Sequence, residues 1–76
     1  MVSTKDVLNT SNDYLHEINT LIRLSKAVEK LVEGLKKGLI DSDALASVKN
    51  NTPYIERQGI IITKKAKKLR VLIESL

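Results

Sequence analysis

The sequence predicts an all-α protein folded as an antiparallel helical hairpin, and three observations lead to this prediction. Apolar side chains recur at alternating intervals of three and four residues in both halves of the chain, which is the spacing of helices that pack at a shallow angle. A short glycine-containing segment at 38–41 separates the two halves, and short connections make consecutive helices antiparallel neighbours. Strand-like composition is limited to the stretch 59–63.

The first helix is expected over about residues 4–37. Ser3 and Asp6 resemble a capping box. In this motif, the side chain of each of two residues at a helix start accepts a hydrogen bond from the backbone N–H of the other. Gly38 can adopt the left-handed conformation that ends a helix, and Asp41 can cap the helix that follows. The expected packing row of this helix comprises Val7, Ser11, Tyr14, Ile18, Leu21, Ser25, Val28, Val32, Leu35 and Leu39.

The second half is expected to hold a short middle helix at about 42–50 and a last helix at about 53–75. Thr52 and Pro53 resemble an N-cap followed by a first helical position, and a proline inside a helix removes a hydrogen bond and clashes with the preceding turn. The alternative is one kinked helix over 42–76, because the apolar spacing continues through the proline. The expected packing row comprises Leu45, Val48, Thr52, Ile55, Gly59, Ile62, Ala66, Leu69, Ile73 and Leu76.

Further apolar side chains lie outside these rows, so the apolar side of each helix is broader than one neighbouring helix can cover. A fully buried Leu or Ile contributes about 1.5–3 kcal/mol, and several of them together are comparable to the stability of a small domain. We therefore predict a protein partner, either a second copy that completes a three- or four-helix bundle or a helical hetero-complex. The predicted partner-binding side chains are Leu8, Leu15, Ile22, Leu24, Leu31, Ile60, Ile61 and Leu72.

A chain of 76 residues forms one domain at most, and folds of this size usually need a staple. The absence of Cys excludes disulfides, and a single histidine argues against a structural zinc site, so neither a cofactor nor a metal is expected. The longest apolar run, 60–62, is too short to span a bilayer, and the first residues do not resemble a secretory signal. We expect a cytoplasmic protein without an integral membrane segment.

Catalytic chemistry is not expected in this chain. His16 is the only imidazole, and nothing near it in the sequence supplies a nucleophile. The carboxylates are dispersed among lysines, as on a solvated helix surface, and Gly34 and Gly38 lack the Lys-Ser/Thr signature of a phosphate loop. The sequence therefore predicts a non-enzymatic interaction protein, a small helical subunit or regulator that acts through coiled-coil-like packing.

The charge is distributed unevenly along the chain. Residues 1–43 contain six Lys/Arg and seven Asp/Glu, whereas residues 44–76 contain seven Lys/Arg and two Asp/Glu. A basic stripe on the last helix could neutralise phosphates, so the alternative function is a small nucleic-acid-binding regulator. Other interpretations are a solvated or protein-facing surface, and a peripheral membrane or immunity-type factor. The possible nucleic-acid-binding residues are Arg57, Lys64, Lys67, Lys68 and Arg70.

Overall fold

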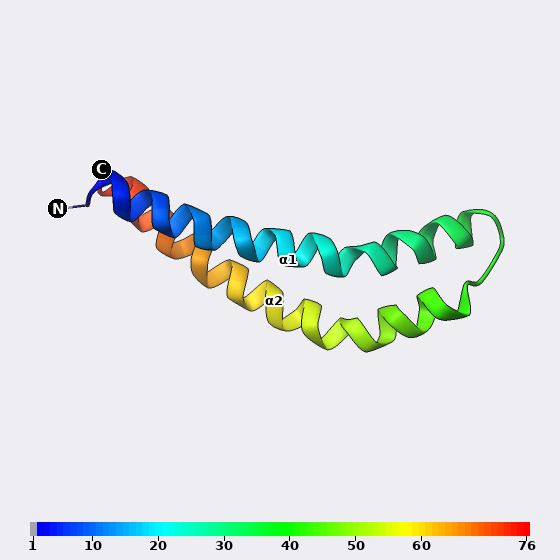
Figure 1. Ribbon diagram of the computed structural model, residues 1–76. Helices are drawn as coiled ribbons and strands as arrows, with labels where there is room; N and C mark the ends of the chain where they lie inside the picture. Colours follow the sequence, from blue (N-terminus) through cyan, green and yellow to red (C-terminus); the bar gives the residue numbers. More distant parts are fainter. Residues whose placement is uncertain (1) are drawn as a thin grey trace.

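The backbone forms two helices of 33 residues each, α1 (Thr4–Lys36) and α2 (Ser42–Glu74), in a computed structural model that describes residues 2–76. The helices run antiparallel, and both chain ends lie at the same end of the molecule (Figure 1). This arrangement confirms the predicted all-α helical hairpin. The molecule is a rod of 55 × 20 × 15 Å.

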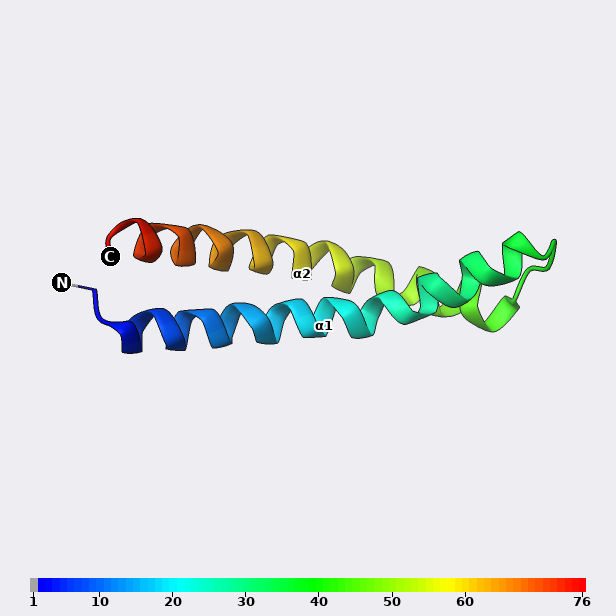
Figure 2. The same ribbon diagram turned by 90° about the horizontal axis from the view of Figure 1, so that it is seen from above.

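The helices wind around one another along this rod. In Figure 1 they overlap near the termini and separate toward the connection, whereas in Figure 2 they lie apart near the termini and cross near the connection. Two straight helices cannot keep a continuous contact when their apolar residues repeat every 3.5 residues, because that repeat drifts around an ideal helix. The winding keeps one face of each helix turned toward the other over the whole length.

The start of α1 is fixed by the predicted capping box. The Asp6 backbone N–H donates to Ser3 Oγ at 3.2 Å, and the Ser3 N–H donates to the Asp6 carboxylate at 3.2 Å. Two of the backbone donors that a helix start leaves without partners are thereby satisfied.

The connection between the helices follows from one glycine. Gly38 has a φ of 75°, the left-handed conformation predicted for it. Its N–H donates to the Leu35 carbonyl at 3.0 Å, and the Leu39 N–H donates to the Gly34 carbonyl at 2.9 Å. These two bonds form a Schellman motif, which satisfies the last carbonyls of α1 and reverses the chain. Asp41 then caps α2, as predicted, by accepting from the N–H of the third helical residue, Ala44, at 3.0 Å.

The predicted short middle helix is wrong, because α2 continues without interruption through Pro53. A proline removes one N–H from the helical hydrogen-bond ladder, and here the missing donor faces solvent, since both Pro53 and Lys49 are exposed. Water can therefore bond the Lys49 carbonyl. Thr52 is a residue of the helix and not a cap, and its hydroxyl donates to the Val48 carbonyl at 2.7 Å. Packing of α2 against α1 on both sides of the proline keeps the two halves in one register.

The row of α2 residues that packs against α1 differs from the predicted row. At every second position, the contact residue is the one directly before the predicted residue in the sequence. Four members of the expected row on α2 are exposed (Leu45, Thr52, Ile73 and Leu76), as are four on α1 (Val28, Val32, Leu35 and Leu39). The row that faces α1 also steps by four and three residues and comprises Ala44, Val48, Asn51, Ile55, Gln58, Ile62, Lys65, Leu69 and Leu72. Two of its polar members, Gln58 and Lys65, explain the difference, because they have partners on α1 that compensate for their removal from water.

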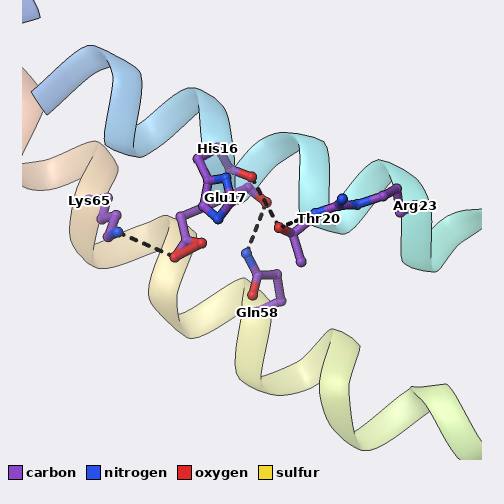
Figure 3. A network of polar contacts seen from close by, with 6 residues as sticks. All are labelled: His16, Glu17, Thr20, Arg23, Gln58 and Lys65. Carbon is purple, nitrogen blue, oxygen red and sulfur yellow. Dashed lines mark hydrogen bonds and ion pairs between the residues drawn. The ribbon is translucent and has the colours of Figure 1, made fainter. Parts of the chain in front are cut away.

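Polar contacts join the helices near their middle (Figure 3). The Gln58 Nε2 donates to the Glu17 backbone carbonyl at 2.9 Å, and Lys65 Nζ lies 3.3 Å from Glu17 Oε2. On the other side of Glu17, the Arg23 guanidinium donates to the Thr20 hydroxyl, which donates in turn to the His16 carbonyl. Glu17 is thus the residue of α1 that meets α2 through both its backbone and its side chain.

Candidate functional site

An apolar surface runs along α1 beside the contact with α2. Three of its side chains follow directly after the inward positions Val7, Tyr14 and Leu21, and a fourth lies farther along α1, and their exposed fractions lie between 43% and 59%. Residues at multiples of seven positions lie on one face of a helix, so the first three side chains form a stripe, and the fourth lies beside it, in line with Ile18 fourteen residues earlier. We call this stripe the outer apolar row, and it comprises Leu8, Leu15, Ile22 and Val32, with the half-buried Ile18 between them.

The outer apolar row is exposed because the hairpin has one contact face. A helix of a globular protein usually buries an apolar stripe about 100° wide. On α1 the polar and apolar residues that meet α2 fill that width, and the outer apolar row lies beside it. Ala44 is the one hydrophobic residue of the described chain that is buried, so the hairpin hides little apolar surface by itself.

The outer apolar row is free of charge over most of its length. Between Leu8 and Ser25, the charged residues of α1 lie elsewhere: Glu17 points toward α2, and Asp13 and Arg23 lie on the opposite flank with Thr20. Figure 3 shows Glu17 directed toward Lys65 on α2, whereas Arg23 reaches back along α1 to Thr20. The side chains next to the row are amides and hydroxyls, which can lie against another protein without a charge to desolvate.

A second group of apolar side chains surrounds the connection. Leu35, Leu39, Ile40 and Leu45 are all exposed there. Three of them belong to the packing rows expected from the sequence, but the helices end before a neighbour can cover them. A shallow depression on α1 lies between this group and the outer apolar row, and it is lined by Ser25, Val28, Glu29, Val32, Glu33 and Lys36. The apolar surface therefore continues along α1 to the closed end of the hairpin.

The predicted partner-binding residues fall into two sets. Leu8, Leu15, Ile22 and Ile60 are exposed, whereas Leu24, Leu31, Ile61 and Leu72 are half-buried. Leu24, Leu31 and Leu72 are at intervals of three or four from inward residues, which places them in the contact between the helices and not on its flank. The exposed Ile60 lies on α2 beside a shallow depression lined by Glu56, Gly59, Ile60, Thr63, Lys64 and Lys67.

The basic stripe is exposed on α2. Within residues 2–76, the exposed members have no carboxylate within 4.0 Å, and Arg57 lies over the Tyr54 ring at 5.8 Å from its centroid. Lys65 belongs to the same sequence run but is half-buried and pairs with Glu17. The five exposed residues are Arg57, Lys64, Lys67, Lys68 and Arg70.

The sequence reasoning missed Gln58 and Lys65 as contact residues. Their signal was present, because 44, 48, 51, 55, 58, 62, 65, 69 and 72 step by four and three residues as regularly as the expected row. Apolar composition favoured the expected row, since it contains no charged side chain. In the structure, a hydrogen bond from Gln58 and an ion pair from Lys65 join the actual row to α1.

Within the described residues, no group of three or more His, Cys, Asp or Glu side chains is arranged to hold a metal ion. One pKa departs clearly from its ordinary value: that of Asp41 lies below 3.8, first because the Ala44 N–H donates to its carboxylate and further because of Lys30, 3.7 Å away, and the Asp43 N–H. The two N–H contacts belong to the cap of α2, and Lys30 reaches the carboxylate from α1. His16 is exposed on the flank of α1.

Within residues 2–76, neither α1 nor α2 contains an apolar stretch of the length that a transmembrane helix requires. Comparisons with models of known protein families, with curated proteins and with solved structures gave no match. The surfaces described above are therefore the basis for a functional proposal.

Proposed function

We propose that this protein is a non-enzymatic interaction subunit that binds a helical protein through the outer apolar row of α1. The observation that carries the proposal is the position of the apolar side chains. Leu8, Leu15, Ile22 and Val32 are between 43% and 59% exposed, whereas the one buried hydrophobic residue of the described chain is an alanine. Leu8, Leu15 and Ile22 have the seven-residue spacing that another helix recognises, because such spacing presents one continuous stripe.

Burial of the row supplies enough free energy to matter. A large aliphatic side chain contributes about 1.5–3 kcal/mol when it is fully buried, and these four are roughly half-exposed in the hairpin. Covering them gains several kcal/mol, which is comparable to the whole stability of a small domain at about 5–15 kcal/mol. Binding of a partner therefore stabilises the hairpin, and burial of the row supplies the free energy of binding.

Affinity capture from the native host tests the proposal, combined with light scattering of the purified chain. The bait is the full chain, as wild type, as the double variant Leu15→Glu and Ile22→Glu, and as the control Ile60→Glu. Ile60 is as exposed as Leu8 but lies on α2. We expect a partner, or a second copy, with wild type and the control but not with the double variant. The proposal is contradicted if the wild-type chain is a monomer and captures no protein that the double variant fails to capture.

A second candidate function is nucleic-acid binding through the basic stripe. It is favoured by the exposure of Arg57, Lys64, Lys67, Lys68 and Arg70 without ion-pair partners within the described chain. Binding of this kind weakens steeply with salt, because phosphate contacts release counterions. Titration of labelled duplex and single-stranded probes at low and high salt tests it, with Lys64, Lys67 and Lys68 changed together to Glu. Absence of binding at low salt rejects this candidate.

A further inference from the structure

We propose that the partner of the outer apolar row is a second copy of this chain, packed antiparallel to the first so that two hairpins form a four-helix bundle. This inference rests on the proposed function, since it names the occupant of the same surface. Three features support it: the excess surface of the hairpin, the absence of charge along the row, and the placement of the basic stripe.

The exposed surface matches what a stable dimer needs. The chain exposes 5879 Å², whereas a compact monomer of 8.5 kDa exposes about 4,700 Å². The radius of gyration is 16.9 Å, against about 11 Å for a compact chain of this length. The hairpin thus carries about 1,200 Å² more surface than a compact monomer. Obligate dimers bury about 1,000–2,500 Å² on each subunit, so covering the excess gives an interface of the required size.

The charge of the row favours a second copy over a charged partner. In a two-fold symmetric interface the same patch lies on both subunits. A charged patch then meets its own sign, which repels, but the outer apolar row is uncharged between Leu8 and Ser25. Glu29 follows Ile22 by seven residues, and an antiparallel pair aligned at the midpoint of α1 places it against Ser11 of the partner subunit and not against its own copy. The basic stripe of α2 would repel its own copy, and the proposed contact leaves it in solvent.

The basic stripe also selects the antiparallel arrangement. Lys64, Lys67, Lys68 and Arg70 lie in the C-terminal part of α2, near the end of the rod that holds the chain termini (Figure 1). A parallel pair of hairpins places both basic regions side by side, whereas an antiparallel pair places them in opposite halves of the rod, where corresponding residues are about 18–36 Å apart because they lie 6–12 residues from the midpoint of α2. At that separation salt screens the repulsion almost completely, because the Debye length is about 8 Å at physiological ionic strength.

Full overlap of two antiparallel hairpins sets the register. The midpoint of α1 is Thr20. A two-fold axis that relates the two copies at this residue places Leu8 against Val32 of the partner subunit. It also places Ile18 against Ile22 of the partner subunit. Both contacts match one aliphatic side chain with another, and Leu15 lies against Ser25 of the partner subunit, which brings no charge into the contact.

Sedimentation equilibrium of the full chain tests the association. We expect a mass of about 17 kDa, twice that of the 8.5-kDa chain, at micromolar concentrations. The double variant Leu15→Glu and Ile22→Glu is expected to be monomeric, and the control Ile60→Glu dimeric. Leu15→Ala guards against loss of folding, because alanine favours helix, and it should raise the dimer dissociation constant at least about tenfold. A monomeric wild type, or a dimer that is indifferent to these substitutions, overturns the inference.

Pulsed electron paramagnetic resonance tests the orientation. The natural chain has no cysteine, so Lys36→Cys gives one spin label per chain at the exposed end of α1. In the antiparallel bundle the two labels are about 50 Å apart, since each lies 16 residues from the axis at about 1.5 Å per residue. A distance below about 20 Å shows a parallel pair and overturns the antiparallel arrangement.

The two proposals fail separately. If wild type is monomeric but captures another helical protein through Leu15 and Ile22, the interaction function stands and the second copy is wrong. If wild type is monomeric and captures no protein in a row-dependent manner, both are wrong.

Discussion

The Gln58 side-chain amide donates a 2.9 Å hydrogen bond to the backbone carbonyl oxygen of Glu17, 41 residues earlier in the chain. Gln58 is 7% exposed and is one of two buried polar residues within the described chain. A buried amide that must meet one particular carbonyl tolerates few alternative alignments of the helices. A polar residue in a helical contact gives up stability but fixes register, as in coiled coils. We infer that this bond sets the alignment of α1 and α2.

Gln58→Glu is predicted to destabilise the hairpin by about 2 kcal/mol at neutral pH, because a carboxylate cannot donate to the Glu17 carbonyl and is costly to bury. Gln58→Met is the matched control. It removes the bond without leaving a buried charge, and the carbonyl keeps its helical partner, so it should cost less than about 1 kcal/mol. Urea denaturation at one fixed protein concentration measures both, since association changes apparent stability. Equal losses for the two variants would show that the buried charge adds nothing to the loss of the amide bond, and no loss in either variant would show that the bond is unimportant.

The ion pair between Lys65 and Glu17 is predicted to contribute more than an exposed pair. Their side chains are 34% and 13% exposed, so Lys65→Ala leaves a mostly buried carboxylate without its cation and should cost about 1–3 kcal/mol. The control is Lys26→Ala in the pair with Glu29, whose side chains are 67% and 60% exposed. That loss should be at most about 0.5 kcal/mol and should vanish in high salt. Urea denaturation at low and high salt distinguishes the two, and a loss at Lys65 no larger than the control contradicts the prediction.

The sequence predicted the hairpin well because its strongest signals are local. The capping box at Ser3 and the left-handed Gly38 depend on a few neighbouring residues, and both appear as expected. The contact row was predicted less well, because two rows one residue apart have the same spacing. The choice between them depends on where Gln58 and Lys65 find partners, which lie more than 40 residues away in the chain.

The candidate surface was predicted in part for the same reason. Leu8, Leu15 and Ile22 are exposed, since they lie beside the contact in either row. Leu24 and Leu31 are half-buried because the actual contact passes closer to them. The prediction of a helix break at Pro53 was wrong for a different reason. It gave the intrinsic cost of a proline more weight than tertiary packing, which holds both halves of α2 against α1.

The cap at Asp41 predicts a specific pH dependence. Its pKa in the folded chain lies below the ordinary 3.8, chiefly because the Ala44 N–H donates to the carboxylate. A depressed pKa stabilises the fold above the unfolded-state value and loses that contribution as the pH falls through the folded-state value. Stability should therefore decrease as the pH falls below 3.8. Asp41→Asn keeps a capping oxygen but does not titrate, so urea midpoints measured against pH should fall less steeply for this variant. Parallel curves for the two proteins would show that other carboxylates cause the loss of stability at low pH.

Pro53→Ala is predicted to stabilise α2, because it restores an N–H that can donate to the Lys49 carbonyl and removes the clash of the ring with the preceding turn. Proline costs about 3 kcal/mol relative to alanine inside a helix, and solvent access to this site reduces the gain to about 1–3 kcal/mol. Pro53→Gly should gain about 1 kcal/mol less than Pro53→Ala. Thermal unfolding followed by circular dichroism measures the order of the three proteins. A melting temperature for Pro53→Ala at or below that of wild type would show that the hairpin needs the bend of a proline.

Two glycines predict opposite effects of one substitution. Gly59 lies inside α2, and a Cβ added there meets nothing within 4 Å, so Gly59→Ala should stabilise the fold by about 0.5–1 kcal/mol through lower entropy of the unfolded chain. Gly38 also has open space around it, but its φ of 75° strains any other residue, so Gly38→Ala should destabilise by about 1–2 kcal/mol. Because neither site is crowded, backbone conformation alone separates the two outcomes. Urea denaturation of both variants checks the signs, and a gain at Gly38 would mean that the connection can rearrange without its Schellman motif.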